Sequence, residues 1–286
     1  MKKPHNVTYL RKAVRGLFET DEKAYRMRVM MANVVIGQVL PDGVVRGGTS
    51  LKLRYGHRAT RFTMDFDAAQ KLGIKDFEDQ LVQKLKVGWE EFTGRLLPAP
   101  RAKSAKKSRL PEEYLMTPFY VKLAYRKQPW CTVKLEVSVD EIGDAEKSDS
   151  IPVPPEVLDA FRQLGFPDPA PIPAMTLEYQ IAQKIHGMTK FGNHRPQDLV
   201  DLQLIARHER IPYKKVGLVC RRLFAYRKQQ PWPSNVAYEA PDWESLYKEA
   251  ADGVDVLQTL EDAVPWGNAL IAKVHRLSKP TRKRGA

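Results

Sequence analysis

The chain has 286 residues, of which 43% are hydrophobic and 28% are charged, and it contains two cysteines. This composition is that of a globular protein; it excludes a disordered or collagen-like chain and a disulfide framework. The 47 Lys and Arg outnumber the 34 Asp and Glu, which gives a net charge of +13. Such an excess favours a polyanionic partner, such as a nucleic acid or a nucleoside triphosphate. On charge alone, an anionic membrane surface is also possible.

No apolar run follows Met1, and the longest apolar stretch, residues 29–40, is interrupted by Asn33 and Gln38. A stretch of this length is too short to cross a bilayer and indicates a buried helix. We therefore expect a cytoplasmic protein with no signal peptide and no membrane partner. The sequence does not indicate an oligomeric state.

The first half of the chain mixes helix and strand patterns. Apolar residues recur at helical spacing over residues 8–36, and a short strand at residues 44–45 precedes a helical pattern at residues 51–55. Residues 61–68 and 132–139 alternate polar and apolar side chains, as half-buried strands do. The core-facing side chains of the first of these strands are then Phe62, Met64, Phe66 and Ala68.

Prolines crowd residues 152–173, and we interpret this stretch as the connection between two domains, with one short helix at about residues 156–164. The predicted domains are residues 1–150 and residues 151–286. The second half is mostly helical, with 3.6-residue patterns at residues 176–188, 196–208, 216–227 and 242–263. Two basic stretches, residues 101–109 and 279–284, are typical of solvated segments, although a phosphate backbone would also suit them.

Asp65 and Asp67 are two residues apart in the first predicted strand, so they share its polar face with Arg61 and Thr63. Two carboxylates on one strand face repel each other unless cations lie between them. Hard divalent ions, Mg²⁺ above all, are the usual cations for such oxygen ligands. A D-x-D pattern alone, however, more often marks only an acidic edge that faces solvent.

Two further patterns favour a nucleotide site. Gly47, Gly48, Thr49 and Ser50 lie between the short strand and the helix that follows it. Glycines at such a turn let the backbone approach a phosphate closely, while hydroxyls and helix N-terminal amides bind its oxygens. Glu136, on the polar face of the later strand, is placed to supply a third carboxylate.

Taken in this order, the patterns resemble the nucleotidyltransferase core shared with DNA polymerase beta, and more narrowly the AbiEii/AbiGii toxin nucleotidyltransferases, which include the MenT group. That family reads G-G-T-x-L and then R-[FY]-S-x-D-h-D, which residues 47–51 and 61–67 match, with Thr63 in place of the usual serine. It then carries a lysine on a helix and an R-x-x-D-h-x-D helix, which Lys184 and residues 195–201 match. Glu136 replaces the commoner aspartate.

The resemblance implies an α/β fold, with a polymerase beta-like core around a mixed sheet and a mostly α-helical C-terminal domain. It also implies a toxin that transfers a nucleoside monophosphate from an NTP to an RNA hydroxyl. The expected acceptor is the 3′ end of tRNA, so that translation is blocked, and the expected protein partner is a cognate antitoxin.

The resemblance further implies roles for particular residues. The expected catalytic residues are Asp65, Asp67, Glu136, Lys184 and Asp198. Two Mg²⁺ ions are expected at Asp65, Asp67 and Glu136. The expected NTP-binding residues are Gly47, Gly48, Thr49, Ser50, Lys52, Arg61, Thr63, Lys184 and Asp201.

Lys184 can also be interpreted from its helix alone, because it falls on the apolar stripe of residues 176–188. Its charge must therefore reach solvent, form an ion pair or enter a cleft. Asp198 lies in the first turn of the next helix, where a carboxylate complements the helix dipole in any case. Pairing of Asp198 with Lys184 or Arg195 would hold the lysine in place.

Two other function classes stay open. The chain could transfer a nucleotide to a small-molecule hydroxyl, although a cationic sugar acceptor would need an acidic cleft and the chain is basic. It could also be a non-catalytic NTP- or RNA-binding module, although such a module does not need two carboxylates arranged for metal ions.

Overall fold

The computed structural model describes residues 2–56, 59–61, 63–100 and 116–279. The chain forms two compact units, the first made of residues 1–57 and 62–175 and the second of residues 58–61 and 176–286. The units thus divide after Met175, whereas the proline-rich stretch placed the division at residue 150. The basic loop expected at residues 101–109 lies outside the described residues, as does the basic stretch from residue 280 onward.

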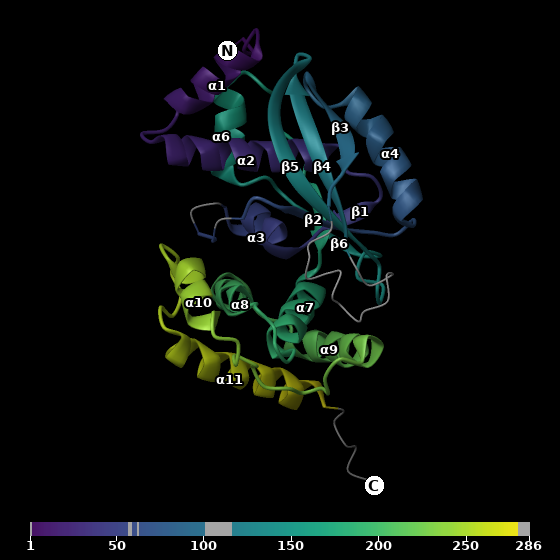
Figure 1. Ribbon diagram of the computed structural model, residues 1–286, viewed down its shortest axis with the longest axis vertical. Coiled ribbons are helices and arrows are strands. Elements are labelled where there is room, and N and C mark those ends of the chain that lie inside the picture. Colours follow the sequence, from purple (N-terminus) through teal and green to yellow (C-terminus); the bar gives the residue numbers. More distant parts are fainter. Residues whose placement is uncertain (1, 57–58, 62, 101–115, 280–286) are drawn as a thin grey trace. The chain divides into compact units, whose positions relative to one another are not determined.

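Within the described residues, one mixed sheet of seven strands organises the first unit (Figure 1). The strands are β1 Gly43–Val45, β2 Phe66–Gln70, β3 Phe92–Pro98, β4 Thr117–Tyr125, β5 Gln128–Val139, β6 Ser148–Ile151 and β7 Ile172–Met175. Their order across the sheet is β3-β4-β5-β2-β1-β7-β6. The pairs β2–β5 and β1–β7 are parallel, and the other neighbours are antiparallel.

The helices of the first unit are α1 Val7–Gly16, α2 Asp21–Gln38, α3 Gly47–Tyr55, α4 Ile74–Val87 and α6 Pro155–Gln163. Helices α1 and α2 pack against β5, and α4 packs against β3. The helical pattern of residues 8–36 corresponds to two helices. Thr20 is the N-cap of the second helix, α2, and its side chain accepts a hydrogen bond from the backbone N–H of Lys23. Residues 156–164 are helical as predicted.

The strand expected at residues 61–68 is shorter than its alternating pattern indicates. Strand β2 begins at Phe66, which is buried like Ala68, but Met64 precedes the strand and is 55% exposed. Phe62 lies outside the described residues. The carbonyls of Thr63 and Asp65 accept hydrogen bonds from side chains of α3, so this segment bonds to a helix where a strand would bond to a neighbouring strand.

The second unit is helical, with α7 Leu177–Thr189, α8 Gln197–His208, α9 Tyr213–Arg227, α10 Trp243–Ala251 and α11 Leu260–Ser278. The prediction of a single helix at residues 242–263 is wrong, because α10 ends at Ala251 and α11 begins at Leu260. The backbone of Leu257 there bonds to the side chains of Gln203 and Tyr247. Thr259 then caps α11. None of the described helices is long and apolar enough to cross a membrane.

Gly88 gives the fold a testable constraint. It ends α4 at φ 77° and ψ −164°, a conformation that is almost restricted to glycine, and an added Cβ would overlap the backbone carbonyl of Phe92. We expect Gly88→Ala to lower the free energy of unfolding by at least about 2 kcal/mol. Gly16→Ala is the matched control, since an added Cβ there has nothing within 4 Å. Urea unfolding that shows equal stability for the two variants would contradict this account.

Candidate active site

Two carboxylates face each other across the middle of the sheet. Asp67 on β2 is the register partner of Glu136 on β5, and neighbouring strands lie about 4.8 Å apart. Each carboxylate is flanked along its strand by buried apolar residues, so both point to the opposite face of the sheet. Asp65 immediately precedes β2. The structure thus brings together the three carboxylates that the sequence predicted as metal ligands.

Lys134 lies among these carboxylates. Its Nζ is 2.5 Å from Oε1 of Glu136 and 3.7 Å from Oδ2 of Asp65. Burial alone would lower the pKa of Lys134, but its hydrogen bond to Glu136 and the charges of the nearby carboxylates raise it. Burial raises the pKa of Asp65, and the charge of Glu136 adds to that effect while Lys134 opposes it. Lys134 is therefore the counter-charge of the cluster.

The donor set suits a hard divalent cation. No described group of three His, Cys, Asp or Glu side chains is already arranged to hold a metal ion. The carboxylate oxygens of Asp65, Asp67 and Glu136 are nevertheless the ligands that Mg²⁺ prefers. Their mutual repulsion is already offset by one cation, the ammonium of Lys134, and a bound divalent ion would take over that role.

The glycine turn lies against Asp67. Helix α3 begins at Gly47, earlier than the helical pattern predicted, and Gly47 has a left-handed φ of 62°. A Cβ at position 47 would overlap the carboxylate of Asp67. The backbone N–H of Arg46 donates to the carbonyl of Asp67 at 2.9 Å. The N-terminus of α3 is therefore fastened to the strand that carries the carboxylate, with Gly47 and Gly48 half-buried.

The α3 side chains expected to bind the triphosphate have other contacts. Thr49 and Ser50 are fully buried, and Lys52 is 1% exposed. The hydroxyl of Thr49 donates to the carbonyl of Asp65 at 2.7 Å, and Nζ of Lys52 donates to the carbonyl of Thr63. These side chains thus hold the segment that carries Asp65, and Thr63 does not lie on a strand face with it.

A second cluster, the ion cluster of Lys184, lies inside the second unit. Nζ of Lys184 is 3.1 Å from Asp198 and 2.6 Å from Asp201, and all three side chains are at least 95% buried. Nε of Arg195 lies 2.8 Å from the second oxygen of Asp198. The predicted pairing of Asp198 with Lys184 or Arg195 is therefore confirmed with both cations.

Arg61 belongs to this cluster and not to the face of β2, where the sequence placed it. Its Nε and Nη2 donate to the two oxygens of Asp201 at 2.9 and 3.1 Å. Burial would raise the pKa of Asp201, but the charges of Arg61 and Lys184 lower it to about 2. Arg61 and Lys184 thus stabilise a fully buried carboxylate in its ionised form.

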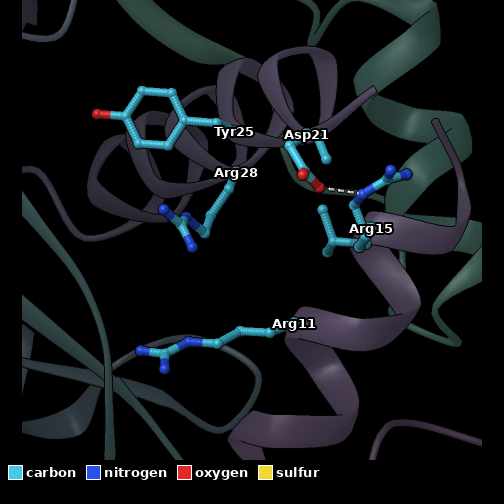
Figure 2. A pocket seen from close by; sticks show the side chains of 7 residues that line it. Arg11, Arg15, Asp21, Tyr25 and Arg28 are labelled. Carbon is cyan, nitrogen blue, oxygen red and sulfur yellow. Dashed lines mark hydrogen bonds and ion pairs between the residues drawn. The ribbon is translucent and has the colours of Figure 1, made fainter. Parts of the chain in front are cut away.

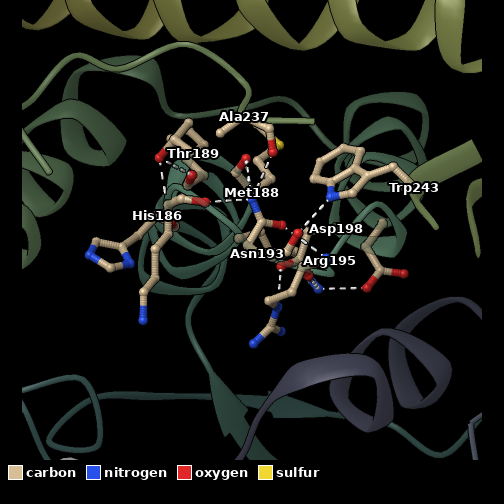
Figure 3. A network of polar contacts seen from close by, with 12 residues as sticks. His186, Met188, Thr189, Asn193, Arg195, Asp198, Ala237 and Trp243 are labelled. Atoms are coloured by element: carbon tan, nitrogen blue, oxygen red, sulfur yellow. Dashed lines mark hydrogen bonds and ion pairs between the residues drawn. The ribbon is translucent and has the colours of Figure 1, made fainter. Parts of the chain in front are cut away.

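A network of polar contacts around Asn193 holds the turn between α7 and α8 (Figure 3). The side-chain amide of Asn193 donates to the carbonyls of Met188 and Ala237, at 3.2 and 2.9 Å. The side-chain oxygen of Asn193 accepts a hydrogen bond from the backbone N–H of Arg195 at 2.9 Å. The indole N–H of Trp243 donates to the backbone carbonyl of Asn193 at 2.7 Å. This network fixes the turn from which Arg195 reaches Asp198.

Lys134 is the site residue that the motif search missed. Its signal was present, because residues two apart on a strand share a face, so Lys134 necessarily lies beside Glu136. A D-x-D pattern indicates carboxylate ligands for a metal ion and does not by itself indicate a neighbouring cation. Asn193 carried no comparable signal, since its contacts come from residues far along the chain.

The family described as "Nucleotidyl transferase AbiEii toxin, Type IV TA system" matches residues 29–267. The chain belongs to this family of nucleotidyltransferase toxins. Membership implies an NTP substrate, typically with a divalent metal ion, and an antitoxin partner. A search of curated proteins finds no match.

Two solved structures match this chain over most of its length. MenT4, the nucleotidyltransferase toxin Rv2826c from Mycobacterium tuberculosis H37Rv, has a TM-score of 0.55 at 14% identity, over 97% of this chain and 100% of that chain. JHP933 from Helicobacter pylori has a TM-score of 0.49 at 13% identity, over 91% of this chain and 94% of that chain. The likeness to MenT4 confirms the predicted α/β fold.

The ion cluster of Lys184 leads to a stability prediction. Asp201→Asn leaves Arg61 and Lys184 with one carboxylate fewer, and breaking such a buried pair costs about 3–5 kcal/mol. Because the folded pKa of Asp201 is lowered to about 2, its contribution is complete near neutral pH and is lost as the pH falls toward 2. Urea unfolding, with hydrogen exchange in α7 and α8, should therefore show a stability gap that narrows on acidification.

The matched control for this experiment is Asp255→Asn, which removes the partner of Arg207 on the surface, where the Asp255 side chain is 81% exposed. Exposed pairs contribute at most about 1 kcal/mol. If Asp201→Asn destabilises the protein no more than Asp255→Asn does, the buried ion pairs do not hold the second unit together.

Proposed function

We propose that this protein transfers a nucleoside monophosphate from an NTP to a hydroxyl of RNA, with the 3′ end of tRNA as the acceptor, and thereby blocks translation. The observation that carries the proposal is the meeting of Asp67 and Glu136 in register, beside the glycine turn of α3. The net charge of +13 supports a polyanionic acceptor over a cationic small molecule.

Asp65 and Asp67 would hold two Mg²⁺ ions, with Glu136 as a third ligand. Such ions, when bound, stabilise charge on the attacking and leaving oxygens. Glu136 would also accept the proton of the attacking hydroxyl, and its position opposite Asp67 at the same level of the sheet supports this role. The ammonium of Lys134 would then move away from Asp65 and Glu136, where an ion takes its place.

The triphosphate would lie at the N-terminus of α3. Because Thr49 and Ser50 are buried, we assign its contacts chiefly to the backbone N–H groups at Gly47 and Gly48. Thr49 and Lys52 would act indirectly, by positioning Asp65 through the carbonyls that they bind. Phosphate binding by Lys184 stays a prediction of the family resemblance, and Asp198 and Asp201 hold its ammonium group within the second unit.

The proposed reaction is tested by incubating the protein with Mg²⁺, total tRNA and each radiolabelled NTP in turn. Wild type should label tRNA, whereas Asp65→Asn and Asp67→Asn should each reduce labelling at least about a thousandfold, because loss of a metal ligand removes charge stabilisation in the transition state. Asp79→Asn, an exposed change in α4, is the matched control and should retain full activity.

Each other outcome of this assay identifies a different function. Pyrophosphate release only with small hydroxylated acceptors would identify a small-molecule nucleotidyltransferase. Binding of NTP or RNA without nucleotide transfer to any acceptor would identify a binding module. Either result overturns the transfer to tRNA, and an active Asp65→Asn protein would overturn the assigned metal site.

Lys134 provides a separate test of the metal site. If a divalent ion replaces its ammonium beside Asp65 and Glu136, Lys134→Gln should tighten Mn²⁺ binding about tenfold, since one competing positive charge is removed. Isothermal titration calorimetry measures this affinity directly. Lys122→Gln, an exposed change on β4, removes the same charge and should leave the affinity unchanged. Equal Mn²⁺ affinity in both variants would mean that Asp65 and Glu136 do not share an ion.

A further inference from the structure

A cavity of 340 Å³ opens between α1 and α2 in the first unit, and we call it the arginine pocket (Figure 2). The residues that line it are Arg11, Val14, Arg15, Asp21, Ala24, Tyr25 and Arg28. Small-molecule sites begin at about this volume, so the arginine pocket can admit one nucleotide unit. None of the motifs that define the candidate active site accounts for it.

Two of the three arginines that line the arginine pocket lack an ion-pair partner within the described part of the chain. Arg15 forms an ion pair with Asp21, as Figure 2 shows. Neither Arg11 nor Arg28 has a carboxylate partner among the described residues. Arg11 bonds through Nη2 to the carbonyls of Pro129 and Trp130, at 2.9 and 3.2 Å. Nε of Arg28 is buried and has no hydrogen-bond partner among the residues that the structure describes.

The two guanidinium groups face a common space. Figure 2 shows Arg11 extending from α1 and Arg28 from α2 toward the same side of the cavity. Both also lower the pKa of the Cys131 thiol against the larger opposite effect of burial, which places both charges near the start of β5. Paired guanidinium groups with unused donors are typical of phosphate sites.

Tyr25 adds an aromatic surface to the charges. Its ring is 40% exposed, and Cζ of Arg28 lies 5.2 Å from the ring centroid. Residues three apart on a helix share a face, and here the guanidinium group of Arg28 lies over the Tyr25 ring. This combination suits a nucleotide of single-stranded RNA, with the base on the ring and the phosphate on the arginine.

The arginine pocket adjoins the segment that carries a proposed metal ligand. The hydroxyl of Tyr25 donates to Sδ of Met64 at 3.1 Å, and Met64 immediately precedes Asp65. Asp67 and Glu136 point away from the apolar face of the sheet that α1 and α2 cover, so an RNA strand with its terminal hydroxyl at the carboxylates would pass the start of β2, at Met64, to reach Tyr25. An acidic protein segment would use the arginines but would have no need for the ring.

We propose that the arginine pocket binds the acceptor RNA next to its reactive end, with Arg11 and Arg28 on a backbone phosphate and Tyr25 stacked on a base. This inference rests on the proposed function, in that RNA is taken as the acceptor. It adds the residues that hold the acceptor, separate from those that hold the NTP.

Binding is tested first without NTP or catalysis, by fluorescence anisotropy of a short labelled single-stranded RNA. Arg11→Gln and Arg28→Gln should each raise the Kd about three- to tenfold and reduce the slope of log Kd against log salt by about one, because one phosphate contact is lost. Tyr25→Leu should raise the Kd by a similar factor with an unchanged salt slope, because stacking releases no counterions.

Lys12→Gln is the matched control, since Lys12 neighbours Arg11 on α1, is exposed and does not line the cavity. It removes the same charge and should change the Kd less than twofold. Equal effects of Lys12→Gln and Arg11→Gln would reduce the arginine pocket to general surface charge and overturn the proposal. Unchanged RNA binding together with lost binding of poly-L-glutamate would also overturn it, in favour of an acidic protein partner.

The transfer assay separates this inference from the proposed function. In wild type that labels tRNA, Arg28→Gln should raise the KM for tRNA and leave the KM for NTP unchanged. Labelling by wild type with an unchanged KM for tRNA in Arg28→Gln would overturn the arginine pocket but not the reaction. Failure of wild type to label any RNA would overturn the reaction, and with it the acceptor role of the arginine pocket.

Discussion

The parallel pairing of β2 with β5 decides where this protein concentrates negative charge. Because Phe66 pairs with Leu135, Asp67 and Glu136 lie opposite each other on one face while apolar neighbours fill the core. A register slip of one residue would turn Asp67 into the core. The repulsion between the carboxylates is offset by Lys134, and their closeness to α3 requires glycine at position 47.

Lys134 and Lys184 each contact two carboxylates, and the degree of burial gives the two lysines different roles. The side chains of Lys134, Asp65 and Glu136 are 27–43% exposed, so water screens their attraction and a divalent ion can replace the ammonium at small cost. The side chains of Lys184, Asp198 and Asp201 are at most 5% exposed. Removing one partner from this cluster would leave a buried charge without a counter-charge, which is costly. The cluster therefore fixes the positions of these three side chains. The first cluster is suited to exchange its cation, and the second is suited to hold its position.

Much of the architecture could be predicted from periodicity, because each helix or buried strand covers one apolar face. The alternation of residues 132–139 correctly predicted a strand, and Val133, Leu135 and Val137 of β5 lie in the core. The proline-rich stretch misled, since β7 contains Pro173 and still joins the sheet. It does so as a short strand between β1 and β6, where pairing with both neighbours outweighs the local preference of proline.

For the candidate site, residue types and their order identified the family, the glycine turn and the three carboxylates, because local spacing places side chains on faces. Local spacing could not predict the hydrogen-bond and ion-pair partners of these side chains. Arg61 pairs with Asp201 and does not share a strand face with Asp65. Thr49 and Lys52 donate to backbone carbonyls that would bond to a neighbouring strand if β2 were longer. These contacts join residues distant in sequence, and only the folded chain sets their distances, since burial makes each polar group bond to whatever partner packing brings within reach.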